Sequence, residues 1–302
     1  MTIQTVLDYL QEKEVAFEVR GNVSAELVYF SSIYNYKANT LTWLRKAETL
    51  EAEDFVRPEA IHCLITGMNA PEIPLALCQI KVKDPRAVFF LVVDAFWGEK
   101  AESGISPQAC IEEGAVIGEN AQIGAFTYIS SQTTIGKDCR IGSNVTIRGK
   151  VHIGDRCVIQ SGAVIGEDGF AFTKDDTGAL TFVKHYGGVW MGDDVSVGAN
   201  TCVARGTIDD TVLMDMVKVD NLCHIAHNVV LGERVEVIAG AVVMGSVHVG
   251  QDSWVSTSMI RDQRHVGKNS VIGMGAVVVR DVPDGVTVAG NPAKPFERKE
   301  KI

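Results

Sequence analysis

Hydrophobic residues recur at every sixth position through most of the chain, from about Ile105 to Val279. Isoleucine fills eleven successive positions at this spacing, from Ile105 to Ile165. The same spacing returns in three further ladders of Val, Leu, Ile and Met, over 191–203, 213–255 and 266–278. A period of six matches neither the 3.6-residue turn of an α-helix nor the two-residue alternation of a simple strand.

A triangular coil explains this period. Each side of the coil is one short strand and one corner, so three sides make a repeat of about 18 residues. One β-branched residue per side points inward, and glycine or asparagine suits the corners. Successive coils stack at the spacing of neighbouring strands, roughly 4.8 Å. The pattern therefore predicts a left-handed parallel β-helix of hexapeptide repeats over residues 101–280, with about eight coils.

The ladder is broken in three places. The first break, Glu167 to Val189, is too long for a corner and is rich in aromatic and polar residues. The second adds four residues between Val203 and Leu213, and the third adds five between Val255 and Val266. Insertions in a solenoid form loops on its faces, and such loops often line a binding surface. We therefore expect three loops.

The first hundred residues lack the repeat and are expected to form a small α/β domain. Residues 2–13 place apolar side chains on one helical face, and Asp84-Pro85 can cap and open a second helix that runs to Trp97. Three apolar runs between them, 27–33, 41–44 and 62–66, are typical of strands. At the other end, residues 281–302 leave the ladder and are expected to cap the open coil.

Composition excludes several functions. The 302 residues carry a formal net charge of -10, which disfavours binding to a phosphate backbone, so we expect no nucleic acid partner. No apolar run of about 18 residues predicts a membrane span, and the N-terminus lacks the pattern of a signal peptide. Seven cysteines without CxxC spacing fit buried, reduced thiols. We therefore expect a cytoplasmic protein.

Several motifs together resemble UDP-3-O-acylglucosamine N-acyltransferases. The segment 188–232, which contains DNLCHIAHN, is similar to the core of that family. GNVSAELVYFSSIYNYKANTLTWL and VKDPRAVFFLVVDAF are similar to its N-terminal, nucleotide-binding domain, and SGAVIGEDGFAF to the stretch before its first large loop. The resemblance implies an enzyme of lipid A assembly that moves a hydroxyacyl chain from acyl carrier protein to a nucleotide-linked amino sugar. It implies no metal, and a homotrimer.

The resemblance places the general base at His227, with Asp220 as an acidic neighbour. An amino group near neutral pH must lose a proton before it can attack a thioester, and a histidine is suited to take that proton. Gly245 lies 18 residues beyond His227, one coil further along the same face. Its N–H is the expected oxyanion donor, and a glycine leaves room for the donor thioester.

Three departures from the family bear on the substrates. In the N-terminal domain the family holds uracil with an aromatic residue, an asparagine and a tyrosine, whereas this chain has Trp43, Lys46 and Thr49. Gln263 stands where the family has a second active-site histidine, among charged residues. The closing motif VPDGVTVAGNPAKPF is similar to that of acetyl-CoA-dependent sugar acetyltransferases. This resemblance implies that Lys294, or the basic residues after it, could meet CoA phosphates in this chain.

These departures favour an N-acyltransferase that uses acetyl-CoA, or another acyl-CoA, on a nucleotide-linked amino sugar for cell-surface polysaccharide. In this hypothesis the loop 167–189 walls the sugar pocket. The alternative is the lipid A enzyme itself, supplied by acyl carrier protein. A third reading is a non-enzymatic assembly or nucleotide-sensing module. A metal-dependent hydratase is a weak fourth, because His224 and His227 lack a third ligand.

Overall fold

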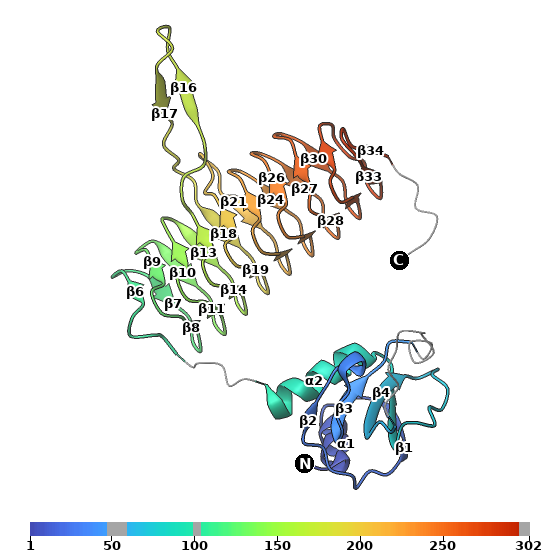
Figure 1. Cartoon of the computed structure of the whole chain (residues 1–302). Helices are drawn as coiled ribbons and strands as arrows, with labels where there is room; N and C mark the ends of the chain where they lie inside the picture. Colours follow the sequence, from blue (N-terminus) through green and yellow to red (C-terminus); the bar gives the residue numbers. More distant parts are fainter. Residues whose placement is uncertain (47–58, 99–103, 296–302) are drawn as a thin grey trace. The chain divides into compact units, whose positions relative to one another are not determined.

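The computed structural model describes residues 1–46, 59–98 and 104–295. The chain divides into two compact units, residues 1–101 and 102–302 (Figure 1). The first unit is a small α/β domain, and the second is a parallel β-helix. Neither of the two α-helices within the described ranges is long and apolar enough to cross a membrane.

The N-terminal unit packs two helices with a five-stranded sheet of order β1-β5-β4-β3-β2. Both predicted helices are confirmed. Asp84 caps α2 as expected by accepting from the N–H of Ala87, and Thr2 caps α1 by accepting from that of Thr5. Strands β1 and β5 were not predicted. The elements are α1 (Ile3–Glu12), β1 (Phe17–Gly21), β2 (Tyr29–Phe30), η1 (Ile33–Asn35), β3 (Thr40–Trp43), β4 (Cys63–Gly67), β5 (Cys78–Val82) and α2 (Pro85–Trp97).

The second unit is a three-sided prism whose sides are parallel sheets of eight, ten and nine strands, apart from one antiparallel strand at its end. The eight-stranded sheet contains β7 (Val116–Ile117), β10 (Thr133–Ile135), β13 (Val151–Ile153), β18 (Val189–Met191), β21 (Thr211–Leu213), β24 (Val230–Leu231), β27 (His248–Val249) and β30 (His265–Val266). The ten-stranded sheet contains β8 (Gln122–Ile123), β11 (Arg140–Ile141), β14 (Val158–Ile159), β19 (Ser196–Val197), β22 (Lys218–Val219), β25 (Glu236–Val237), β28 (Trp254–Val255), β31 (Val271–Ile272), β33 (Thr287–Ala289) and β34 (Lys294–Pro295). The nine-stranded sheet contains β6 (Cys110–Ile111), β9 (Tyr128–Ile129), β12 (Thr146–Ile147), β15 (Val164–Ile165), β20 (Cys202–Val203), β23 (His224–Ile225), β26 (Val242–Val243), β29 (Met259–Ile260) and β32 (Val277–Val278).

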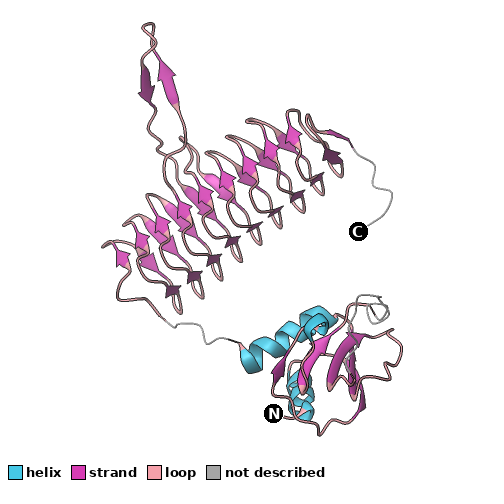
Figure 2. Ribbon diagram, in the orientation of Figure 1, coloured by secondary structure: helices cyan, strands magenta, loops and turns pink. Residues whose placement is uncertain are grey.

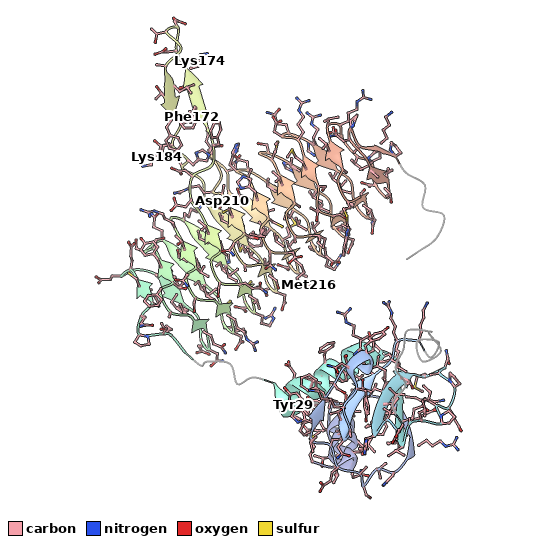
Figure 3. The ribbon with its side chains drawn as sticks, viewed as in Figure 1. Tyr29, Phe172, Lys174, Lys184, Asp210 and Met216 are labelled. Carbon is pink, nitrogen blue, oxygen red and sulfur yellow. The ribbon has the colours of Figure 1, made fainter. Side chains whose placement is uncertain are left out.

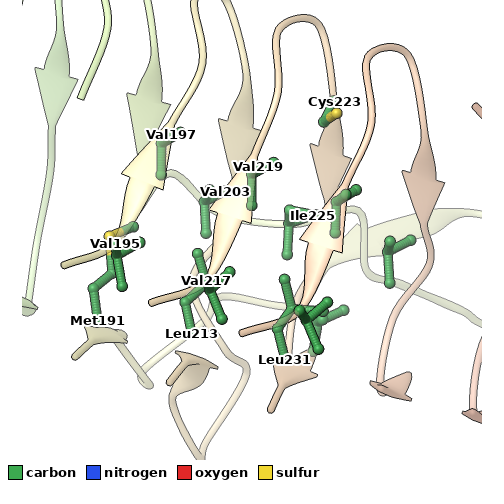
Figure 4. Packing of buried hydrophobic residues seen from close by; sticks show 14 of the residues in the cluster. Met191, Val195, Val197, Val203, Leu213, Val217, Val219, Cys223, Ile225 and Leu231 are labelled. Carbon is green, nitrogen blue, oxygen red and sulfur yellow. The ribbon is translucent and has the colours of Figure 1, made fainter. Parts of the chain in front are cut away.

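The ladder residues form the core of the prism. From Ile123 onward they are buried and stack on their equivalents one coil away, as Figure 4 shows for Val197, Val219 and their neighbours. Cys139, Cys157 and Cys223 share this core as small apolar residues, whereas Cys110 and Cys202 are exposed. All seven cysteines are free thiols. The repeated inward residue therefore accounts for the stacked coils of this unit.

The expected loop in the third break is wrong. Met259 and Ile260 form β29 and pair in parallel with Val242 and Val243. Ile260 is fully buried in the ladder, five residues after Val255 and six before Val266. This side of the coil is one residue shorter than the others, so it satisfies the core without an insertion. The charged residues that follow Ile260 belong to an ordinary corner.

The end of the chain also differs from the expectation. Val282 and Val288 are buried in the core, and β33 pairs in parallel with β31. The ladder therefore continues for about one more coil beyond Val278. Strand β34 then folds back antiparallel on β33 and covers the sheet edge.

The first break forms a long arm. Strands β16 (Phe172–Lys174) and β17 (Leu180–Phe182) pair as an antiparallel hairpin. Figure 2 shows this arm projecting from the side of the β-helix. Its aromatic residues are exposed, including Phe170 at 86%. The second break forms a compact loop over residues 205–210.

Candidate functional site

One corner of the prism brings together three of the candidate residues and both insertions. This corner, which we call the insertion corner, is where the chain passes from the nine-stranded to the eight-stranded sheet. The arm leaves it between β15 and β18, and the loop 205–210 between β20 and β21. His227, Gly245 and Gln263 occupy it on three successive coils, because each follows a strand of the nine-stranded sheet.

Asn228 sets the hydrogen-bonding state of His227. The Nδ1 atom of His227 lies 3.1 Å from Oδ1 of Asn228. This oxygen also accepts from the N–H and the hydroxyl of Thr207, at 3.1 and 2.8 Å. Because an amide oxygen only accepts, Nδ1 of His227 must donate its proton. The neutral imidazole therefore carries its free lone pair on Nε2, the nitrogen that a general base needs.

Gly245 lies directly against that nitrogen. A Cβ atom placed on Gly245 would be 2.7 Å from Nε2 and 2.6 Å from Cε1 of His227. The two coils are joined beside this contact by the N–H of Ser246, which donates to the carbonyl of His227 at 2.9 Å. Within the described part of the chain, the N–H of Gly245 donates to no acceptor. The lone pair on Nε2 of His227 and the unpaired N–H of Gly245 therefore belong to adjoining groups.

Two further residues close the site from the arm. His185 lies 5.5 Å from His227 between ring centroids, with the ring planes at 77°. A Cβ on Gly169 would lie 3.0 Å from both His185 and His227. Sequence reasoning missed His185, Gly169 and Asn228. The useful signals were a histidine and a glycine inside the first break, and an asparagine directly after the candidate base.

Asp220 does not contact His227. It lies at another corner, between β22 and β23. There its carboxylate accepts from the N–H of Asn221 and from that of Ala239, one coil away. Within a single chain Asp220 bridges successive coils, and the group that orients His227 is the amide of Asn228.

Gln263 lies next to Gly245, whereas Lys294 lies on a different sheet of the prism. The N–H of Gln263 donates to the carbonyl of Gly245 at 2.9 Å, and its side chain is exposed at the insertion corner. Lys294 is exposed in β34, on the edge of the ten-stranded sheet. Among the described residues, no hydrogen bond or ion pair joins Lys294 to His227 or Gly245. The basic residues expected beyond it lie outside the described residues.

Trp43 and Lys46 belong to the N-terminal unit. The half-buried Trp43 packs 6.3 Å from Phe89 between ring centroids and lines a cavity of about 240 Å³. The exposed Lys46 lines a cavity of about 420 Å³ together with Arg45 and Lys83. Thr49 lies outside the described residues. Trp43 therefore has a role in the core as well as a surface on which a base could stack.

Asp210 in the loop 205–210 makes polar contacts at the insertion corner. This residue is labelled in Figure 3. It accepts from the N–H of Gly188 at 2.7 Å and pairs with Lys150, which ties the base of the arm to the loop. Burial, and secondarily the nearby His227, lowers the pKa of the His224 imidazole.

Among the described residues, no group of three or more His, Cys, Asp or Glu side chains is placed to hold a metal ion.

Comparison with known proteins confirms the resemblance seen in the motifs. Residues 114–149 and 132–167 match the bacterial transferase hexapeptide family model (six repeats). A UDP-3-O-acylglucosamine N-acyltransferase from Caulobacter sp. (strain K31) is 40% identical over 48% of this chain and 43% of its own length. One from Delftia acidovorans is 39% identical over 64% of this chain and 60% of its own. The matched region thus spans about two fifths to three fifths of these relatives.

Solved structures confirm the left-handed parallel β-helix. The UDP-N-acetylglucosamine acyltransferase of Bacteroides fragilis is 26% identical, with a TM-score of 0.59 over 64% of this chain and 74% of that one. The corresponding enzyme of Francisella novicida is 25% identical, with a TM-score of 0.60 over 65% of this chain and 71% of that one.

Proposed function

We propose that this chain is an N-acyltransferase that moves an acyl group from a thioester to the amine of a UDP-linked glucosamine. The observation that carries the proposal is the pairing of the free Nε2 of His227 with the open N–H of Gly245. Relatives about 40% identical carry the name of this activity.

The proposed reaction is a displacement at the thioester carbonyl, with His227 accepting one proton from the amino group and later returning it to the leaving thiolate. Nε2 of His227 removes a proton from the sugar ammonium, and the freed amine attacks the thioester carbonyl. A C–N bond forms, and the carbonyl electron pair becomes an oxyanion that accepts the N–H of Gly245. The tetrahedral intermediate then loses the second proton of its nitrogen to solvent and collapses to the amide. The C–S bond breaks, and the thiolate leaves with the proton that His227 held.

Asn228 supports this proton transfer from the other side of the ring. When His227 becomes an imidazolium, its Nδ1–H continues to donate to Oδ1 of Asn228. Asn228 is itself fixed by Thr207, whose N–H and hydroxyl donate to the same oxygen. The site therefore needs no side-chain reorganisation when the charge develops.

For the substrates, we propose a UDP-glucosamine that already carries a 3-O-acyl group, with acyl carrier protein as the donor. The names of the relatives support this acceptor. Acetyl-CoA is the second candidate donor, supported by the closing motif and the exposed Lys294. Trp43 and the cavity lined by Lys46 are the proposed nucleotide-binding surface of the N-terminal unit.

We also propose that the chain acts as a homotrimer. The outward row of the nine-stranded sheet is apolar over several coils apart from His224, and its side chains are exposed or only partly buried in one chain. It runs through Val164, Cys202, His224, Val242, Met259 and Val277. An apolar strip of this kind is typical of a surface that is covered by another subunit.

A donor screen by free-thiol release tests the function. Hydroxyacyl carrier protein, acetyl-CoA and longer acyl-CoAs are offered with UDP-3-O-acylglucosamine and with other UDP- and dTDP-linked amino sugars. We expect release from the carrier protein with the 3-O-acylated acceptor. His227→Ala should abolish it, and His224→Ala, in the same coil, should not. Release from acetyl-CoA alone would establish the second candidate, and an active, folded His227→Ala would refute the mechanism.

A further inference from the structure

His185 is buried at the base of the arm and lacks one hydrogen bond. Only 1% of the residue is exposed. Its Nδ1 lies 3.0 Å from the carbonyl oxygen of Val183, so Nδ1 must be the protonated nitrogen. Within the described residues, Nε2 of His185 has no hydrogen-bond partner. Leaving a buried polar atom unpaired is costly, and folded proteins keep such atoms where they serve a purpose.

The ring of His185 is held from three directions. Phe182 stacks on one face, with 6.2 Å between ring centroids and 15° between planes. Val183 fixes Nδ1. The following residues, Tyr186 and Gly187, both donate their N–H groups to the carbonyl of Thr207. His185 is therefore a rigid element, although the arm above it projects into solvent.

His185 also packs against His227. The two rings meet edge to face. Gly169 passes beside both, and a Cβ there would approach Nε2 of His185 and Cδ2 of His227 to 3.0 Å each. Glycine at 169 thus leaves the space in which the two imidazoles pack together.

One hydrogen bond cannot by itself fix the ring of His227. A single bond from Nδ1 to Asn228 does not stop the ring from turning out of that contact and losing the bond. A second contact on the Cδ2 side would stop this movement and keep Nε2 over Gly245. His185 supplies that contact with its buried ring.

We propose that His185 is a positioning residue for His227, which locks the imidazole in the orientation that presents Nε2 to the reacting amine. The inference rests on the proposed role of His227 as the base. It also assigns a function to the base of the arm: its packing sets the geometry of the site from outside the β-helix.

Two measurements on the full chain test this proposal. The first is a two-bond ¹H–¹⁵N spectrum of histidine-labelled protein at about pH 8, with His227 assigned from His227→Gln. We expect a single tautomer of His227, protonated on Nδ1, in the wild type. In His185→Ala we expect signals of both tautomers. His185→Phe, which keeps a ring of similar size, should restore the single tautomer.

The second measurement is the separation of kcat from KM with the donor and acceptor identified by thiol release. We expect His185→Ala to lower kcat by at least about tenfold, with both KM values within about twofold. His185→Phe should recover most of kcat. Gly169→Ala keeps both histidines in the sequence but adds a Cβ between their rings, so it should lower kcat as His185→Ala does. Leu180→Ala, an exposed residue of the arm outside the ring contacts, is the matched control and should behave as wild type.

An unchanged tautomer together with an unchanged kcat in His185→Ala would overturn the proposal. So would a raised KM at unchanged kcat, which would make His185 a substrate-binding residue. Wild-type protein that turns over no donor would instead refute the proposed function, and the spectrum of His227 would still test the packing.

Discussion

Asn228 decides which nitrogen of His227 can act as a base. Its backbone has φ of 59°, in the left-handed region, which turns its side chain back toward His227 at the corner. Asparagine tolerates this conformation better than most residues and offers an amide oxygen that only accepts. The conformation of one corner residue thus determines the proton-accepting atom of its neighbour.

Replacing Asn228 with glycine should remove this control without backbone strain, because glycine adopts positive φ freely. We expect kcat to fall by about 100-fold, since the ring loses the bond that fixes its tautomer. Initial rates of thiol release measure the effect. Asn269→Gly is the matched control, because Asn269 also has positive φ, at 55°, at an exposed corner. Equal rates for both variants would show that the amide is dispensable.

Gly245 offers a second test at the same scale. An alanine there would place its Cβ within 2.7 Å of Nε2 of His227, so the ring must move away. A displacement of about 1 Å in a catalytic group can cost about 100-fold in rate. We therefore expect Gly245→Ala to lose at least that factor in kcat while its thermal unfolding midpoint stays close to that of the wild type. Gly285→Asn, at a corner where a Cβ meets no atom within 4 Å, should retain full activity.

The elements of the β-helix are held together at the corners as well as in the core. Arg156 makes a bidentate contact with Asp194 on the next coil, at 2.7 and 3.0 Å. The guanidinium of Arg156 holds the pKa of Asp194 below its usual value. Because both groups are about 40–45% exposed, salt screens much of this attraction.

The pair predicts a pH-dependent contribution to stability. A carboxyl whose pKa is lowered by folding stabilises the native state above its unfolded pKa, about 3.9, and this contribution is lost as pH falls through the folded pKa. Asp194→Asn should therefore be less stable than the wild type at pH 7, with the difference vanishing well below pH 4. Urea unfolding at several pH values measures it. Asp176→Asn, on the exposed arm, should show no such difference at any pH.

The short side of the coil at β29 can be tested by its core residue. If Ile260 belongs to the ladder, Ile260→Ala should lower the free energy of unfolding by about 2–5 kcal/mol. The neighbouring Arg261 is exposed, and Arg261→Ala should change it by less than about 0.5 kcal/mol. Chemical denaturation of both variants compares the two positions. A small effect at Ile260 would favour the loop that the sequence suggested.

At the scale of the whole molecule, the β-helix was predictable because one inward residue per side repeats the same requirement many times. The predictions fail where two successive inward residues are not six positions apart. Ile260 follows the previous inward residue by five positions, and Val282 follows Val278 by four. A search for a strict period of six therefore treats both places as breaks. In the structure both residues still reach the core. Counting sixes detects the period but not a corner that has lost a residue.

The site was predictable only in part, for a different reason. His227 and Gly245 lie 18 residues apart, so the period itself placed them together. His185 and Gly169 reach the same corner through the arm, where no period applies and only tertiary packing brings them near. Asp220 shows the converse: it is seven residues from His227 in sequence, yet the chain turns through a whole side of the prism between them.

The two units have separate hydrophobic cores, and this predicts how the molecule unfolds. Among the residues that the structure describes, the cores of the first unit draw on residues up to Trp97, and that of the second on residues from Ala109 onward. Units without a shared core unfold independently, so a single two-state transition is not expected. We expect calorimetry of the full chain to resolve two transitions. Residues 102–302 expressed alone should keep a β-rich circular dichroism spectrum and reproduce one of them. Loss of both transitions in that fragment would mean that the β-helix depends on the N-terminal unit for its stability.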